Sequence, residues 1–134
     1  MKIKNILLYL HQLPQNLIGL ILILWNKKTL KKITDKKTKI TYYTAEKVAN
    51  AGISLGNYII LDSDIHISEK DIRHEHGHQL QSIKLGWLYL IIIGIPSFLG
   101  NLYDRLFNKS YEWYYNQPWE KWADDLGEVN RFKK

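Results

Sequence analysis

A run of uncharged residues at positions 85–103 most constrains how this chain of 134 residues can fold. It reads LGWLYLIIIGIPSFLGNLY and is bounded by Lys84 and Asp104. Its length meets the lower requirement for a helix that spans a membrane, but the glycines and Pro96 argue against a straight one. We therefore expect a segment that is embedded in or closely associated with a membrane, or else a core helix that is broken at Pro96.

A second apolar segment occupies residues 15–25. Residues 3–25 share early lysines and an apolar stretch with signal peptides, but lysines follow them where a cleavage site with small residues would stand. Pro14 divides this region into two predicted helices, at about 3–12 and 15–30. The second is too short in apolar length to cross a bilayer, so we expect it to lie at the membrane interface or against residues 85–103.

The net charge of +6 is concentrated near the second apolar segment, because seven lysines fall within residues 26–39. Lysines beside apolar residues are typical of a segment at a membrane surface, although a solvated basic loop fits equally well. No nucleic acid is expected as a partner, since no aromatic residues alternate with the lysines. If a membrane is involved, the lysines favour its cytoplasmic side, and the alternative is a soluble cytoplasmic protein. The chain has no cysteine, so a metal site would need histidine and carboxylate ligands.

The fold class predicted from these patterns is α+β, with residues 1–134 forming one domain. Strand signals at 38–46 and 53–61, the latter containing a turn at Gly56 and Asn57, predict a small antiparallel sheet. Ser68 with Asp71 three residues later predicts the cap of a helix over 69–84. Pro118 predicts the start of a short helix that ends near Gly127.

The sequence HEHGH, residues 74–78, lies inside the helix predicted over 69–84. His74 and His78 are four residues apart and point in the same direction, about 6 Å from each other, so they can share one zinc ion. His76 falls on the opposite, apolar stripe and is expected to be a core residue. In metallopeptidases with this H-E-x-x-H spacing, the residue at the position of Glu75 is the general base.

A catalytic zinc site needs a third protein ligand. His11 and His66 are candidates, but EKWADDLG near the C-terminus offers Glu120 and Asp124 four residues apart on one helical face. Glu120 could bind the ion while Asp124 accepts a hydrogen bond from the outer nitrogen of a liganding imidazole. Ala123 between them is small enough for two helices to approach closely.

The motif H-E-x-x-H with a downstream E-x-x-A-D resembles the gluzincin group of zinc metallopeptidases. More closely, the blocks HEHGHQLQS, GWLYLIIIGIPS and EKWADDLG together with QLPQNL resemble a family of small bacterial HExxH proteins. The resemblance implies a minimal zincin-like domain with Zn²⁺ held by His74, His78 and Glu120. It also implies that Glu75 is the general base and that Asp124 accepts a hydrogen bond from a liganding imidazole.

These observations favour a zinc-dependent metallopeptidase that hydrolyses peptide bonds of a peptide or protein substrate. The region 53–61 could align an extended substrate by edge pairing, and Tyr114, Tyr115 and Arg131 are candidates for stabilising an oxyanion. Two alternatives remain open. One is a catalytically inactive, zinc-binding scaffold associated with a membrane, and the other is a lysine-rich protein that binds lipid or nucleic acid.

Overall fold

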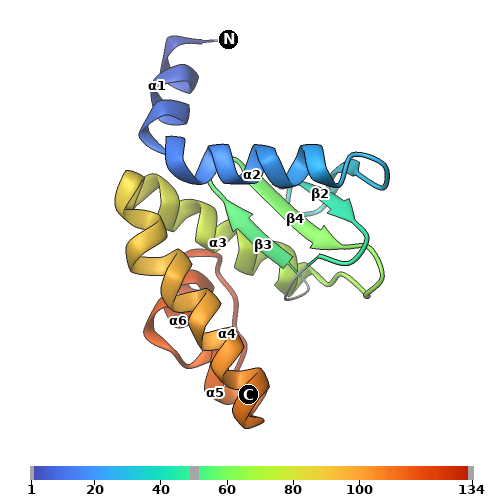
Figure 1. The fold of residues 1–134 in the computed structure, drawn as a ribbon, viewed down its shortest axis with the longest axis vertical. Helices are drawn as coiled ribbons and strands as arrows, with labels where there is room; N and C mark the ends of the chain where they lie inside the picture. The colour runs from blue at the N-terminus through green and yellow to red at the C-terminus, as the bar shows by residue number, and fades with distance from the viewer. Residues whose placement is uncertain (1, 49–51, 133–134) are drawn as a thin grey trace.

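The computed structural model describes residues 2–48 and 52–132 and has an α+β architecture (Figure 1). A small sheet is packed between α2 on one side and α3 on the other. Helix α6 packs along α3, and α4 and α5 both contact α6. In chain order the elements are α1 (Ile3–His11), α2 (Leu13–Trp25), β1 (Lys31–Thr34), β2 (Thr41–Ala45), β3 (Gly52–Leu55), β4 (Tyr58–Asp62), α3 (Glu69–Leu85), the 3-10 turn η2 (Gly86–Leu88), the π-helical turn η3 (Leu90–Gly94), α4 (Ile95–Phe107), α5 (Tyr111–Tyr115) and α6 (Pro118–Leu126).

The strands of the described residues form one four-stranded sheet with the order β1-β2-β4-β3. The sheet is mixed, so the expectation of an antiparallel sheet was wrong: β2 and β4 run parallel, whereas β1 pairs with β2 and β3 with β4 in antiparallel fashion. The reason is that the β3–β4 hairpin turns β4, not β3, towards β2. Ile59, Ile60 and Leu61 of β4 are all buried, and such a continuous apolar run suits a central strand.

Strand β1 was not predicted, because it lies inside the lysine-rich region. All four of its residues are exposed, and two of them are lysines. The β-strand propensity of these residues gives little indication of a strand. Their conformation is decided by pairing with β2. At the edge of the sheet these charges oppose pairing with another chain.

The first two helices meet at Gln12 with a bend of 91°. Pro14 stands in the first turn of α2, where its missing N–H costs no hydrogen bond. The two helices were therefore predicted correctly in number, but the second ends at Trp25 and not near residue 30. There the side chain of Asn26 donates to the carbonyl of Leu22, and turns follow.

Residues 90–107 form one continuous helix, made of η3 and α4, so the alternative of a core helix broken at Pro96 is wrong. Pro96 lies in the first turn of α4, and the π-helical turn before it takes up the irregularity. This helix is long and apolar enough to cross a membrane by length and composition alone, and α1 with α2 passes the same test only as one bent pair. Only 11% of the window is buried, which is the reverse of a core helix.

Helix α3 packs on the sheet and supplies the centre of the molecule. Its capping box between Ser68 and Asp71 is present as predicted. Ile72 of α3 joins Tyr42, Ile59 and Leu61 in the hydrophobic core. His76 does not join that core, contrary to expectation. It is half-buried in a groove that Tyr43 also lines, and its Nδ1 lies 3.0 Å from Gln79 Oε1.

Candidate metal centre

The two imidazoles of the HEHGH segment converge on one carboxylate from the far end of the chain. His74 Nε2 and His78 Nε2 each lie 3.1 Å from the same oxygen, Oε2 of Glu120. All three side chains are buried, and the possible ligand atoms lie within 4.8 Å of one another. The structure therefore brings together the three residues that the sequence predicted as metal ligands.

Close contact between α3 and α6 makes this convergence possible. A Cβ atom on Gly77 would lie 1.9 Å from the carbonyl oxygen of Ala123, and one on Gly127 would lie 2.0 Å from that of Arg73. The small size of Ala123 was recognised in the sequence. The more restrictive requirement for no side chain at Gly77, in the middle of the motif, was missed, and the only signal for it was a glycine placed inside a helix.

The outer nitrogen of each imidazole has an acceptor of its own. His74 Nδ1 lies 2.7 Å from Oδ1 of Asp124, as predicted, and His78 Nδ1 lies 2.7 Å from Oε1 of Gln81. Gln81 is oriented by its amide nitrogen, which donates to the carbonyl of Trp119 at 2.8 Å. Each Nδ1 therefore carries a hydrogen, and in a neutral ring the lone pair of Nε2 faces Glu120. Gln81 was not identified from the sequence.

Three lone-pair donors that face one another repel unless a cation or a proton lies among them. Burial by itself lowers the pKa of His74, but hydrogen bonds to Asp124 and Glu120 and the nearby charge of Glu75 outweigh it and raise this pKa to about 9. Burial raises the pKa of Glu120, but hydrogen bonds from both histidines outweigh the effect of burial and hold this pKa well below its usual value. The carboxylate of Glu120 thus stays ionised and attracts positive charge. Two imidazole nitrogens and a carboxylate oxygen are a donor set that fits zinc.

Glu120 is itself held by a second set of contacts. Its other oxygen, Oε1, accepts hydrogen bonds from Ser97 Oγ and, at 3.1 Å, from the hydroxyl of Tyr114. Ser97 comes from α4 and Tyr114 from α5, so three helices fix this carboxylate. The role of Ser97 could not be seen in the sequence, where it appeared only as a polar residue inside the apolar run.

Asp124 is oriented from behind by Arg131. The guanidinium donates to both carboxylate oxygens, at 2.8 Å and 2.9 Å, and stacks on the ring of Tyr115 at 3.6 Å. Arg131 was one of the candidates for oxyanion stabilisation. Its position behind Asp124 instead makes it part of the chain of contacts that orients His74.

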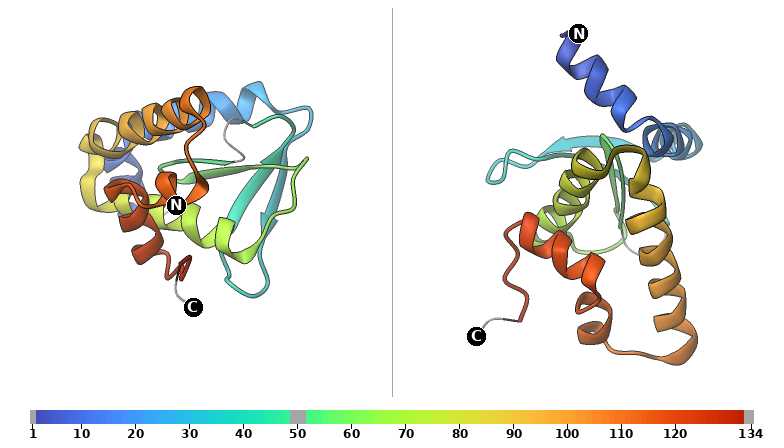
Figure 2. Two further views of the ribbon diagram at one scale, coloured as in Figure 1. Left: turned by 90° about the horizontal axis from the view of Figure 1, so that it is seen from below. Right: turned by 90° about the vertical axis from the view of Figure 1, so that its left-hand side faces the viewer.

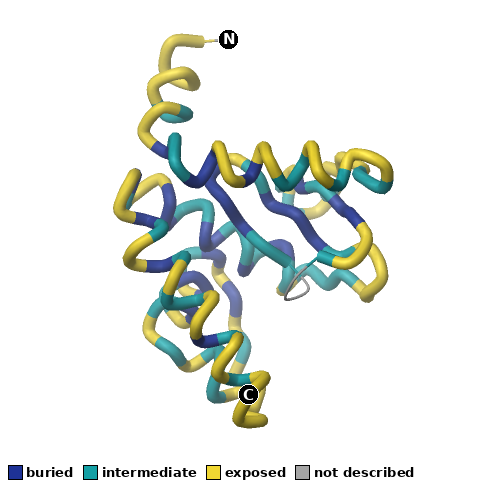
Figure 3. Tube along the Cα trace, in the orientation of Figure 1, coloured by how far each residue is buried: buried dark blue, intermediate teal, exposed yellow. Residues whose placement is uncertain are grey.

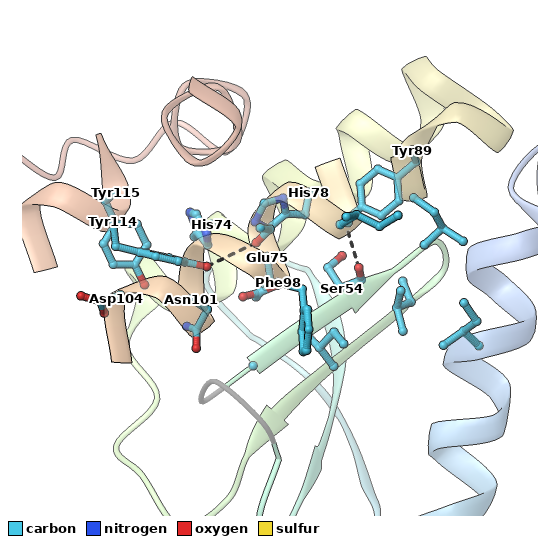
Figure 4. A pocket seen from close by; sticks show the side chains of 18 of the residues that line it. Ser54, His74, Glu75, His78, Tyr89, Phe98, Asn101, Asp104, Tyr114 and Tyr115 are labelled. Carbon is cyan, nitrogen blue, oxygen red and sulfur yellow. Dashed lines mark hydrogen bonds between the residues drawn. The ribbon is translucent and has the colours of Figure 1, made fainter. Parts of the chain in front are cut away.

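A cleft of about 740 Å³ opens beside the two histidines, and Glu75 lines it (Figure 4). Its walls come from β3, from the helix over residues 90–107, and from α5. Burial raises the pKa of Glu75. A Cβ atom on Gly52 of β3 would lie 3.3 Å from Glu75 Oε1, so the backbone of this strand passes directly beside the glutamate.

Two other histidines that were possible third ligands lie elsewhere. His11 bonds the carbonyl of Ile83 at 2.9 Å, and His66 is exposed in the loop before α3. No protein-family model, no curated protein and no solved structure matches the chain.

Proposed function

We propose that this protein is a zinc-dependent metallopeptidase with a small zincin-like, gluzincin-like active site. His74, His78 and Glu120 are the ligands, Glu75 is the general base, and Asp124 orients His74. The observation that carries the proposal is the position of both Nε2 atoms, each 3.1 Å from one buried carboxylate oxygen. The acceptors behind the rings, which leave both lone pairs directed inwards, support it further.

A zinc ion held by these ligands would supply a Lewis acid that lowers the pKa of water and polarises a peptide carbonyl. Glu75 would accept a proton from the attacking water and deliver it to the leaving nitrogen. The raised pKa of Glu75 suits both halves of this role, since a carboxylate with an ordinary pKa is a weaker base and holds the proton less well.

The outer edge of β3, which pairs with no other strand of the described residues, supports a peptide as the substrate. The hydroxyl of Tyr89 donates to the carbonyl of Ser54 at 3.0 Å, so this carbonyl points away from β4. Because strand residues alternate, Gly52 presents its backbone groups at the same edge, and the side of Gly52 from which a Cβ would project faces Glu75. An extended peptide paired there would place a backbone carbonyl beside the proposed base.

Tyr115 remains a candidate for stabilising the oxyanion. Tyr114 and Tyr115 both line the cleft, and burial raises the pKa of each, so both hydroxyl groups stay protonated at neutral pH. The hydroxyl of Tyr114 donates to Glu120, whereas that of Tyr115 can donate to an oxyanion.

The test combines elemental analysis of the purified protein with hydrolysis of fluorescently labelled casein. We expect close to one zinc per chain, and little in the double variant His78→Ala, Glu120→Ala. Glu75→Gln, which keeps the size of the side chain, should retain zinc but lower hydrolysis about 100- to 10,000-fold. Negligible zinc in the unaltered protein would refute the centre. Zinc with hydrolysis that Glu75→Gln leaves unchanged would refute the peptidase and favour a scaffold that is not catalytic.

A further inference from the structure

The burial pattern of helix α2 is the inverse of that in a water-soluble protein, because its polar side is buried and its apolar side is exposed. Its buried residues are Gln15, Asn16 and Gly19, whereas Leu17, Ile21 and Leu24 are exposed (Figure 3). The inward amides are bonded: Gln15 Nε2 donates to Ser82 Oγ and to a backbone carbonyl, each at 2.8 Å, and Asn16 Oδ1 accepts from the backbone of the β3–β4 turn at 2.7 Å. The polar side is therefore fixed against the protein, and the apolar side faces outwards.

Helix α4 shows the same inversion. Ser97, Asn101 and Asp104 recur at helical spacing and line the cleft, whereas Leu99, Leu102 and Leu106 are exposed. Such a helix has the two sides of an amphipathic helix, but its polar side is the one that contacts the rest of the protein. Exposed aliphatic side chains on one helix are ordinary, but a whole side of two helices is not.

The two inverted helices lie on the same face of the molecule (Figures 1 and 2). We call the residues Leu17, Ile21 and Leu24 of α2 with Leu99, Leu102 and Leu106 of α4 the outer face. The cleft opens between the helices, since Ile18 of α2 and Phe98 of α4 both line it and both are exposed. A ligand that enters the cleft past these two side chains therefore crosses the outer face.

The charge beside the α2 part of the outer face is mainly positive. The first 34 residues contain six lysines and no acidic residue, and Lys27 and Lys28 follow directly on the end of α2. Trp25, at that same end, is 84% exposed. Lysines attract anionic headgroups, and tryptophan favours the boundary between headgroups and acyl chains. The outer face thus combines an apolar surface with the charge that complements an anionic membrane.

We infer that the outer face docks on an anionic phospholipid membrane, and that the cleft takes peptide segments carried by that membrane. The choice of substrate rests on the proposed peptidase function, whereas the docking does not. Helices α2 and α4 lie in the interface and do not cross the bilayer. Helix α4 cannot cross it, because Ser97 bonds Glu120 and Gly100 lies against Trp119, and crossing would carry the metal centre into the lipid.

Docking is tested by sedimentation with vesicles of phosphatidylcholine, with and without phosphatidylglycerol. The unaltered protein should bind the anionic vesicles more strongly. The face variant Ile21→Ser, Leu24→Ser, Leu99→Ser, Leu106→Ser and the charge variant Lys27→Glu, Lys28→Glu should each bind them at least about tenfold more weakly. Ile33→Ser on β1, which removes an exposed aliphatic side chain outside the outer face, should bind as the unaltered protein does.

Three outcomes of this experiment would overturn the docking. The unaltered protein could fail to bind vesicles, or it could bind neutral and anionic vesicles equally. It could also form a dimer by light scattering that the face variant converts to a monomer, without binding vesicles. In that last case a second copy of the chain, and not lipid, covers the outer face.

The substrate assignment is tested with one peptide, either free in solution or attached to anionic vesicles by a lipid anchor. The unaltered protein should cleave the tethered peptide faster. The face variant should lose this advantage while it keeps its zinc and its rate on the free peptide. Binding to vesicles with equal cleavage of both forms would overturn the substrate assignment alone. A protein that binds vesicles and cleaves neither form would refute the peptidase and leave the docking in place.

Discussion

The contact between Gly77 and Ala123 offers a sharp test of how the metal centre is assembled. A Cβ atom at position 77 would lie 1.9 Å from the carbonyl oxygen of Ala123, 2.7 Å from its carbonyl carbon and 3.1 Å from its Cα. All three atoms belong to the backbone of α6, so no side chain can move aside. Gly77→Ala therefore has to push α6 away from α3.

The size of the movement follows from these distances. Ordinary van der Waals contact begins at 3.4 Å, so the two helices must separate by about 1.5 Å. Metal ligands tolerate deviations of only about 0.2 Å. Glu120 would leave bonding distance of the histidines, and we expect zinc affinity to fall at least about 100-fold. Overpacking should also lower the free energy of unfolding by roughly 1–3 kcal/mol.

The matched control is Gly100→Ala on α4, another helical glycine that faces α6. There the nearest atom to an added Cβ is Cζ2 of Trp119 at 3.5 Å, which is ordinary contact. The higher helix propensity of alanine should then stabilise the protein by up to about 1 kcal/mol, with zinc binding unchanged. Urea denaturation and zinc titration measure both quantities. If Gly77→Ala were as stable as Gly100→Ala and bound zinc normally, the close packing of α3 on α6 would be refuted.

Three further outcomes follow from the contacts of the centre and of α2. Asp124→Asn should weaken zinc binding about 10- to 100-fold in a competition titration, because an amide orients His74 less firmly than a carboxylate, and an unchanged affinity would remove Asp124 from the centre. In the zinc-free protein the pKa of His74 is raised from 6.5 to about 9, so its contribution to stability is complete below pH 6.5 and is lost as the pH rises through 9. Thermal unfolding in the presence of a chelator should therefore show that the unaltered protein loses more stability between pH 7 and pH 10 than His74→Gln does. Equal losses of stability would show that the His74 imidazole is not held by these hydrogen bonds. Gln15→Leu should lower the free energy of unfolding by roughly 1–3 kcal/mol, because it removes the buried hydrogen bonds to Ser82 Oγ and to the carbonyl of Gly86, whereas Leu24→Gln on the exposed side of α2 should change it by less than about 0.5 kcal/mol.

Helices α3 and α6 were predictable because each has a signal at its start, whereas the short helix α5 was not predicted. Ser68 and Asp71 fix the start of α3, and Pro118 fixes the start of α6. Sheet order had no such local signal. The parallel pairing of Tyr43 with Ile60 depends on which strand of a hairpin turns inwards, and this is decided by burial over the whole domain.

The three side chains that converge at the centre could be predicted, but the contacts that support them could not. His74 and His78 are related by the geometry of a single helix, and Glu120 with Asp124 by the geometry of another. Gln81, Ser97 and Gly77 act across helices, so their roles appear only when the helices are packed. His76 was wrongly predicted to be a core residue for the same reason. The position of a residue around the helix identifies the apolar stripe, but not which part of that stripe the sheet covers.

The order of the ligands along the chain has a consequence for synthesis. Both imidazoles lie on α3, whereas the carboxylate lies on α6, more than forty residues later. At ordinary rates of translation the ribosome needs on the order of a few seconds to add that stretch. A growing polypeptide therefore carries an incomplete centre until α6 has emerged.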